Sequence, residues 1–380
     1  MRILLNVFVH YFAINNILFN ISFVYIMRLS RKKGVKKNKT AKKKYVMKGG
    51  IKTKLMKLIN AAAAAAAAAD ADAEIKKKLE IINLIQQNPK DVGFVDVKTG
   101  FTALIIACQY EMSDVALELI KTGYSNPGQE EEDDDATALI IACQQKMSAV
   151  ALELIATGDS EPGQPNADGD TALIIACEQE MSDVALALIA TGDSEPGETD
   201  DEGNTALIIA CEHEMSDVAL ALIATRYSKP ELVNIHNNTA LIMACDKGMS
   251  DVALALIATG DSEPGETDDD GNTALIIACE NEMSDVALAL IATGQSNPAQ
   301  ANDDGNTALI MATDKNMSDV ILAINNAITA INNDITAMYD AKDAIYDAEN
   351  PGHALPAAGG KTKNKKKKKR KTKKRRGFFF

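Results

Sequence analysis

One pattern of apolar and polar residues recurs along most of the chain. The tripeptide Thr-Ala-Leu begins seven times, spaced once by 35 residues and then five times by 34: at Thr102, Thr137, Thr171, Thr205, Thr239, Thr273 and Thr307. In each unit a short apolar run, such as 205–211, is followed by a polar linker and a second apolar run, such as 215–223. Repetition at this period predicts an array of small structural units instead of several independent domains.

Each unit predicts two helices. The first apolar run ends in the polar residues 212–214, which suits a helix of two turns. Ser216 is placed to cap the second helix, and Asp217 in its first turn complements the helix dipole. Most units close the second helix with a glycine, as expected where φ is positive: Gly123, Gly158, Gly192, Gly260 and Gly294. Because one pair cannot bury its own apolar face, we expect about seven units to stack into an all-α solenoid with capping helices at its ends.

Further helical patterns flank the array. The alanine run 61–69 is expected to continue into an amphipathic helix over 74–87 that stops at Pro89, so that residues 61–97 form the N-terminal cap; its apolar stripe is Ile75, Leu79, Ile82 and Ile85. After the last unit, one stripe continues through 321–350: Ile324, Ile328, Ile331, Ile335, Met338 and Ile345. We expect a C-terminal cap helix there, and the alternative is a partner-binding or dimerising helix.

The repeat resembles the ankyrin repeat. Its period, the Gly-x-Thr-x-Leu opening, the alanine near the end of the first helix and the Val-x-x-x-Leu-Ile second helix fit that family over residues 98–320. Three departures are visible: Thr-Ala-Leu-Ile replaces Thr-Pro-Leu-His, Glu-Met or a variant replaces Gly-His except at Gly248, and Asp-Ser-Glu-Pro-Gly replaces Ala-Asp-Val-Asn. The resemblance, which extends to the uniform ankyrin arrays of large DNA viruses, implies a curved stack that binds a protein on its concave, loop-bearing face.

Charge is segregated along the chain. Residues 1–60 hold 15 Lys/Arg and residues 351–380 hold 13, and neither stretch has an acidic residue. The body, 61–350, therefore holds 12 Lys/Arg against all 53 Asp/Glu, a net charge of −41. A body of this charge favours a protein partner with a basic segment.

The two ends predict roles of their own. Residues 1–29 are apolar and long enough to span a bilayer, so they form either a membrane anchor followed by a basic linker, 30–60, or a stretch upstream of a true start at Met27 or Met47. Residues 351–380 are expected to be a disordered polybasic tail. This tail is a nuclear signal, contacts nucleic acid or anionic lipid, or docks on the acidic body. Its predicted contact residues are Lys367, Lys368, Lys369, Arg370, Lys371, Arg375 and Arg376.

Candidate partner contacts lie at the ends of the first helices and at the loop tips. Most are acidic, but one unit departs from its neighbours and carries a near-neutral island that also includes Lys229 and Asn237. Such a departure is either a recognition patch or ordinary drift of the repeat. The predicted contacts are Glu178, Glu180, Asp201, Glu212, His213, Glu214, Arg226, Tyr227, His236, Lys247, Asp269, Glu280 and Glu282.

The remaining chemistry is sparse. One cysteine per unit occupies the same place in the first helix, in units about 8–10 Å apart, which is too far for a disulfide: Cys108, Cys143, Cys177, Cys211, Cys245 and Cys279. We expect small buried side chains in a reducing compartment. Acidic loops such as 268–271 lack the ligand spacing of a calcium loop, so no metal or other cofactor is predicted. No nucleophile, base and acid can be assigned, which argues against an enzyme.

Together these patterns predict a monomeric, intracellular, non-enzymatic adaptor that holds a basic protein segment on its acidic concave face. The alternative is a spacer tethered to a membrane or to nucleic acid, whose basic ends carry the function.

Overall fold

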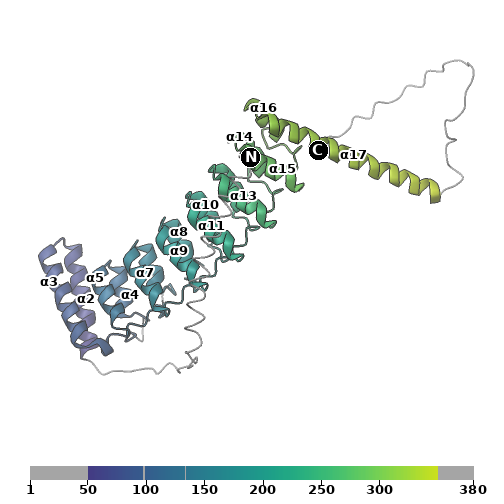
Figure 1. Ribbon diagram of the computed structural model, residues 1–380. Helices are drawn as coiled ribbons and strands as arrows, with labels where there is room; N and C mark the ends of the chain where they lie inside the picture. Colours follow the sequence, from purple (N-terminus) through teal and green to yellow (C-terminus); the bar gives the residue numbers. More distant parts are fainter. Residues whose placement is uncertain (1–49, 97–98, 133, 350–380) are drawn as a thin grey trace, which may run out of the picture. The chain divides into compact units, whose positions relative to one another are not determined.

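The computed structural model describes residues 50–96, 99–132 and 134–349 (Figure 1). Within these ranges the chain forms the α-helices α2 to α17 and one 3-10 turn at Pro89–Asp91, with no β-strand. It divides into two compact units, one ending at Ile328 and the other beginning at Thr329, inside α17. The predicted anchor, most of the basic linker and the polybasic tail lie outside the described residues.

Helix pairs follow one another along the first unit (Figure 1). The first helices of the pairs are α4 (Ala103–Gln109), α6 (Ala138–Gln144), α8 (Ala172–Glu178), α10 (Ala206–Glu212), α12 (Ala240–Asp246), α14 (Ala274–Glu280) and α16 (Ala308–Asp314). The second helices are α5 (Ser113–Lys121), α7 (Ser148–Thr157), α9 (Ser182–Thr191), α11 (Ser216–Thr225), α13 (Ser250–Thr259) and α15 (Ser284–Thr293). Each first helix contacts the next first helix, and each of these second helices contacts the next second helix. The predicted all-α solenoid is therefore confirmed.

A threonine sets the start of every first helix. Thr205 has an extended backbone at the N-cap of α10, and its side-chain oxygen accepts a hydrogen bond from the backbone nitrogen of Ile208 at 3.3 Å. The same bond recurs in all seven pairs at 3.1–3.4 Å. It satisfies one of the amide groups that have no carbonyl partner in the first turn of a helix.

The second helices begin one residue earlier than predicted, as α11 shows. Met215 occupies the N-cap position of α11 without a side-chain hydrogen bond, and Ser216 is already the first helical residue, so the predicted serine cap is wrong. The reason is the preceding turn, in which Glu214 has φ 54° and accepts a hydrogen bond from the Ser216 backbone nitrogen. This turn directs the Met215 side chain into the core, where it is buried.

Four of the five predicted glycine ends of the second helices are confirmed; in the first pair α5 ends at Lys121, and Thr122 precedes Gly123, which has φ 70°. Gly158, Gly192, Gly260 and Gly294 take the left-handed conformation directly after their helices. In α11 this place is held by Arg226, which adopts φ 61° without being a glycine. The Thr225 hydroxyl donates to the Leu222 carbonyl at 2.7 Å and accepts from the Tyr227 backbone nitrogen at 3.2 Å, which holds the chain end in this turn.

The core runs through the whole stack. All six residues from Ala206 to Cys211 in α10 are buried, because helices of the same pair and of both neighbouring pairs surround it. The six cysteines are free and buried, as predicted, and burial raises the pKa of the Cys211 thiol to about 12. Helix α16, which is the first helix of the last pair, buries only Ala308 and Ala312 and leaves Ile310 exposed.

The N-terminal cap is a hairpin of two helices and not the single extended helix that was predicted. Helix α2 (Ile51–Ala67) begins inside the expected basic linker, and α3 (Ala71–Gln87) begins after Asp70, whose carboxylate accepts from the Ala73 backbone nitrogen at 3.0 Å. Helix α2 packs on α3 and α4, and α3 packs on α5, so the hairpin takes the place of a repeat at this end. The reason is burial: folding back covers Leu55 and Ile59 of α2 as well as Ile81 and Ile85 of α3.

Part of the predicted stripe in α3 was placed on the wrong face. Ile81, Leu84 and Ile85 are buried, whereas Ile75 and Leu79 are exposed. The helical period was read correctly, but α2 and α5 cover the face of α3 that carries Ile81, Leu84 and Ile85, and not the face of Ile75 and Leu79.

Helix α17 (Ser318–Glu349) begins as the second helix of the last pair and continues without a break. Val320 and Ile324 are buried in the core, and Ile328 packs against it. From Ile331 onward the large apolar side chains that the structure describes are exposed.

Candidate functional site

Each pair is joined to the next by an acidic loop with a fixed internal geometry. In the loop 200–204, the Asp200 carboxylate accepts hydrogen bonds from the backbone nitrogens of Glu202 (3.0 Å) and Asn204 (2.7 Å) and from the Asn204 amide (2.9 Å). Gly203 adopts φ 79° between them. An antiparallel bridge between Thr199 and Thr205 ties the loop to the start of α10. The loop is therefore held in one shape beside its own first helix.

Asparagine side chains connect neighbouring loops. The Asn234 amide donates to the Asn204 side-chain oxygen at 2.8 Å, and the Asn302 amide donates to that of Asn272 at 2.7 Å. In the alternate loops, Asp200 and Asp268 take the place that Asn234 and Asn302 hold, and an ionised carboxylate cannot donate a hydrogen bond. The side-chain connection is therefore made at alternate junctions.

One junction differs because it sets two carboxylates on neighbouring loops. The residue before the first-helix threonine is asparagine in four pairs, at Asn204, Asn238, Asn272 and Asn306, but aspartate at Asp170. Partial burial raises the pKa of Asp170; the Asn166 hydrogen bond lowers it, and the charge of Asp200 raises it again. This junction is thus more acidic than its repeat equivalents.

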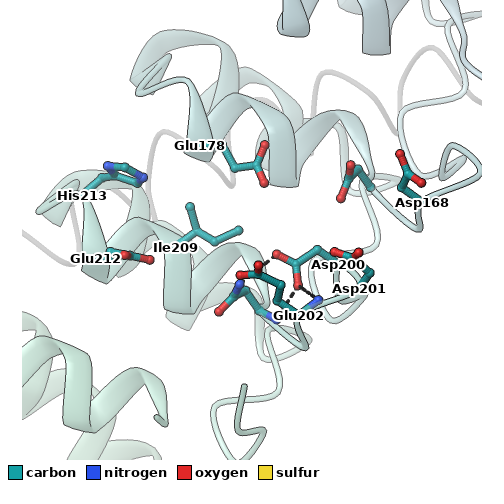
Figure 2. Close-up of a pocket in the computed structure, with 10 residues that line it drawn as sticks. Asp168, Glu178, Asp200, Asp201, Glu202, Ile209, Glu212 and His213 are labelled. Atoms are coloured by element: carbon teal, nitrogen blue, oxygen red, sulfur yellow. Dashed lines mark hydrogen bonds between the residues drawn. The ribbon is translucent and has the colours of Figure 1, made fainter. Parts of the chain in front are cut away.

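A hollow of about 440 Å³ opens at this junction (Figure 2). Seven of its ten lining residues are carboxylates and none is Lys or Arg: Asp168, Asp170, Glu178, Asp200, Asp201, Glu202, Asn204, Ile209, Glu212 and His213. Figure 2 shows Glu178 at the end of one first helix, Ile209 on the next, and the loop carboxylates facing the space between them. The arrangement suits a cationic group that enters from solvent.

Glu178 is the carboxylate of the hollow that differs most from its equivalents in burial. It is half-buried, whereas Glu212 and Glu280, its equivalents in other pairs, are exposed. Burial, and after it the charges of four neighbouring carboxylates, together raise the pKa of the Glu178 carboxyl from 4.5 to about 7; these neighbours are Asp170, Asp200, Glu202 and Asp201. A positive charge brought into the hollow would offset these negative charges.

The structure brings together some of the predicted contact residues and separates others. Glu178, Asp201, Glu212 and His213 line the hollow, and Glu180 lies beside its rim, with 3.9 Å between its carboxylate and His213 Nδ1. Glu214 lies in the turn that follows His213. Further along the stack, Glu280 ends α14, and Glu282 lies in the next turn, where Lys315 reaches it at 3.7 Å. Asp168, Asp170, Asp200 and Glu202 were missing from the predicted set. The signal that could have found the junction is the aspartate at 170 where other units have asparagine.

The near-neutral island is divided between different places in its pair. Arg226, Tyr227 and Lys229 follow the end of α11, where Tyr227 and Lys229 pack close to Gly197 of the preceding loop. His236 lies at a loop tip, 3.4 Å from the Asp269 carboxylate of the next loop, which also accepts from the Asn237 amide at 2.8 Å. Lys247 follows α12 and pairs with Asp246 at 3.1 Å. Among the described residues, no hydrogen bond or ion pair joins these three groups.

Two further findings bear on the chemistry of the chain. Across the residues that the structure describes, no three His, Cys, Asp or Glu side chains converge as metal ligands do. In the same ranges no helix combines the length and the apolar character needed to cross a membrane. The predicted tail contacts from Lys367 to Arg376 lie outside these ranges.

The fold and its loops define a class of protein, the all-α scaffolds built from stacked helix pairs. A family model described as ankyrin repeats in three copies matches residues 66–161, 150–234, 173–264 and 241–336. The chain therefore belongs to the ankyrin-repeat family, as its resemblance implied. A comparison with curated proteins gives no match. Ankyrin repeats are in general protein–protein interaction modules and typically not enzymes.

Proposed function

We propose that this chain is a non-enzymatic adaptor that holds a basic segment of a partner protein in the acidic hollow between α8 and α10. The observation that carries the proposal is the seven carboxylates around one hollow without a lining Lys or Arg. Lysine and arginine side chains are the cationic groups that proteins offer to such a surface, and arginine matches carboxylates bidentately.

The surrounding charge supports the same partner chemistry. The body 61–350 carries a net charge of −41, so its field attracts basic segments before contact and speeds their association. Within the hollow, the raised pKa of Glu178 reflects its burial first and then the charges of the neighbouring carboxylates. A bound cation would favour the ionised form of Glu178, so binding should release less free energy at a pH below about 7.

The test is the binding of a fluorescent lysine- and arginine-rich peptide to the full chain, followed by anisotropy at two salt concentrations. The double variant Glu178→Gln/Asp201→Asn removes two charges from the hollow. The control Glu280→Gln/Asp303→Asn removes two charges at the equivalent places three repeats along the stack. Because distant exposed charges are screened within about 8–10 Å, the hollow variant should weaken binding at least about tenfold and the control much less.

Two results would overturn the proposal. Equal weakening by both variants would mean that the peptide follows the overall negative charge and not the hollow. Affinity that does not change with salt would mean that charge attraction is not the source of binding. The tethered-spacer alternative is checked separately in cells, by expressing the chain without residues 361–380 and following its localisation. If localisation then disappears while the hollow variants have no effect on any partner, the basic tail carries the function.

A further inference from the structure

Helix α17 carries an apolar seam with the spacing of a coiled coil. The intervals alternate between three and four residues along Ile321, Ile324, Ile328, Ile331, Ile335, Met338, Lys342 and Ile345. This 3.5-residue repeat keeps one narrow stripe on one side of the helix over several turns, which is the pattern by which two helices pack side by side. Only Lys342 interrupts it.

The seam changes surroundings along its length. At its start, Ile324 is fully buried, and Ile321 and Ile328 pack against the core of the first unit. Beyond Thr329 the same stripe is exposed: 43% for Ile331, 45% for Ile335, 73% for Met338 and 61% for Ile345. Four large apolar side chains at coiled-coil spacing are thus uncovered on a helix that continues from a packed one.

We propose that this exposed seam is an interface for a second copy of the chain, whose α17 packs against it in the antiparallel direction. The charges along the helix are the reason for proposing a second copy as the partner and the antiparallel direction for its helix. In a parallel pair, Lys342 would face Lys342 of the partner subunit in the same layer, which sets like charges together. In the antiparallel pair, Ile335 faces Met338 of the partner subunit, and Lys342 faces Ile331 of the partner subunit.

The antiparallel arrangement also gives Lys342 a partner. Asp334 lies three residues after Ile331, so it stands one turn along the same side of the helix, within reach of the long side chain of Lys342 of the partner subunit. The positions that flank the seam are otherwise uncharged where the structure describes them, as at Asn332 and Ala341. Two identical helices can therefore approach without like-charge repulsion beside the seam. Each contact made by one copy is repeated by the other, as a two-fold interface requires.

This inference does not depend on the acidic hollow, and it replaces the monomer expected from the sequence. A dimer would present two binding sites to one partner. For a partner with two basic segments, this raises the apparent affinity through effective concentration without any new contact.

The experiment is sedimentation velocity of the full chain over a micromolar concentration series. The wild-type chain should move from monomer to dimer. Ile335→Asp places a charge in two layers of the interface, and the dimer should weaken at least about 100-fold. The matched control is Asn333→Asp, which adds the same charge on the opposite, exposed side of α17 and should leave the dimer unchanged. Ile335→Ala keeps the helix, because alanine favours it, and should still weaken the dimer.

Cysteine cross-linking then tests the direction. Mixing the Ile331→Cys chain with the Lys342→Cys chain should give a cross-linked heterodimer, because these positions face each other only in the antiparallel pair. The native cysteines are buried and do not compete under native conditions. A chain that stays monomeric at every concentration would overturn the proposal, and so would a dimer that both Ile335 variants leave intact. Cross-linking of Met338→Cys with itself in place of the mixed pair would overturn the direction.

Discussion

Glu178 offers the sharpest test of the electrostatics of the hollow. Replacement by glutamine keeps the shape of the side chain and removes its charge. The carboxyl has a pKa of about 7 in the folded chain and 4.5 as its ordinary value, so between these pH values the folded chain binds more protons than the unfolded chain. The stability that Glu178 contributes is therefore highest below about pH 4.5 and is lost as the pH rises through about 7.

The magnitude follows from the same two values. One pKa unit corresponds to about 1.4 kcal/mol, so the full difference would amount to about 3 kcal/mol. Glu178 is only half-buried, and solvent screens part of its interactions, which reduces the expected effect to about 1–2 kcal/mol. Glu178→Gln should therefore raise the free energy of unfolding by about 1–2 kcal/mol near pH 8 and change it little near pH 4.5.

Urea unfolding followed by circular dichroism at a series of pH values measures this difference. The control is Glu280→Gln, which makes the same change at an exposed equivalent place outside the hollow. Comparing each variant with the wild-type chain at the same pH removes the titration of all other carboxyls. A gain that is the same at both ends of the pH series would refute the reasoning. Destabilisation by Glu178→Gln near pH 8 would also refute it, because it would mean that the ionised carboxylate makes a favourable contact.

The remaining predictions concern the repeat itself. Glu214→Gly should stabilise the chain by about 0.5–1 kcal/mol in urea unfolding, because glycine adopts the positive φ of this turn without the side-chain clash that a glutamate carries. Arg226→Gly should act in the same direction at the end of α11 for the same reason, and a loss of stability in either variant would contradict it. Thr205→Ala should cost about 1–2 kcal/mol, because it removes a buried cap from the Ile208 amide. Thr205→Ser, which keeps the hydroxyl, should recover most of that loss.

The helix pairs could be predicted because every local signal agrees with the stack. Thr205 begins a helix, an apolar run fills it, and Gly192 or Gly260 ends the second helix of a pair; repetition confirms the pattern seven times. Glu214 could not be recognised in advance as a residue with positive φ, because glutamate seldom adopts it. Among the seven residues at this place, only Gly248 and Asn316 are of types that favour the conformation this turn needs.

The N-terminal hairpin was missed for a different reason. An alanine run predicts helix strongly but carries no information about which side is covered. The chain reverses at Asp70 because apolar faces on both sides of it, with Leu55 in α2 and Ile85 in α3, gain more by packing together than by extending. The exposure of Ile75 follows from the same packing, which no periodicity within α3 alone could determine.

Part of the candidate site could not be predicted from the sequence, for a similar reason. Glu178, Asp201, Glu212 and His213 were selected as exposed ends and loop tips, and the structure places all four around one hollow. That they meet at this junction depends on the distance between neighbouring loops, which is a property of the stack. Asp170 could not be weighed without that distance, because a lone aspartate in an acidic loop is ordinary.

The repeats themselves show what the aspartate at 170 costs and where. Four other pairs place asparagine there, and Asn204 and Asn272 each accept a hydrogen bond from the following loop. At Asp170 the following loop presents Asp200 instead, so a hydrogen bond between two asparagine amides is replaced by two carboxylates whose charges repel. Natural proteins most often break a local rule of stability where the break serves a function. The same junction holds the half-buried Glu178 and the acidic hollow, so the departure coincides with a place where a cationic partner would restore the balance of charge.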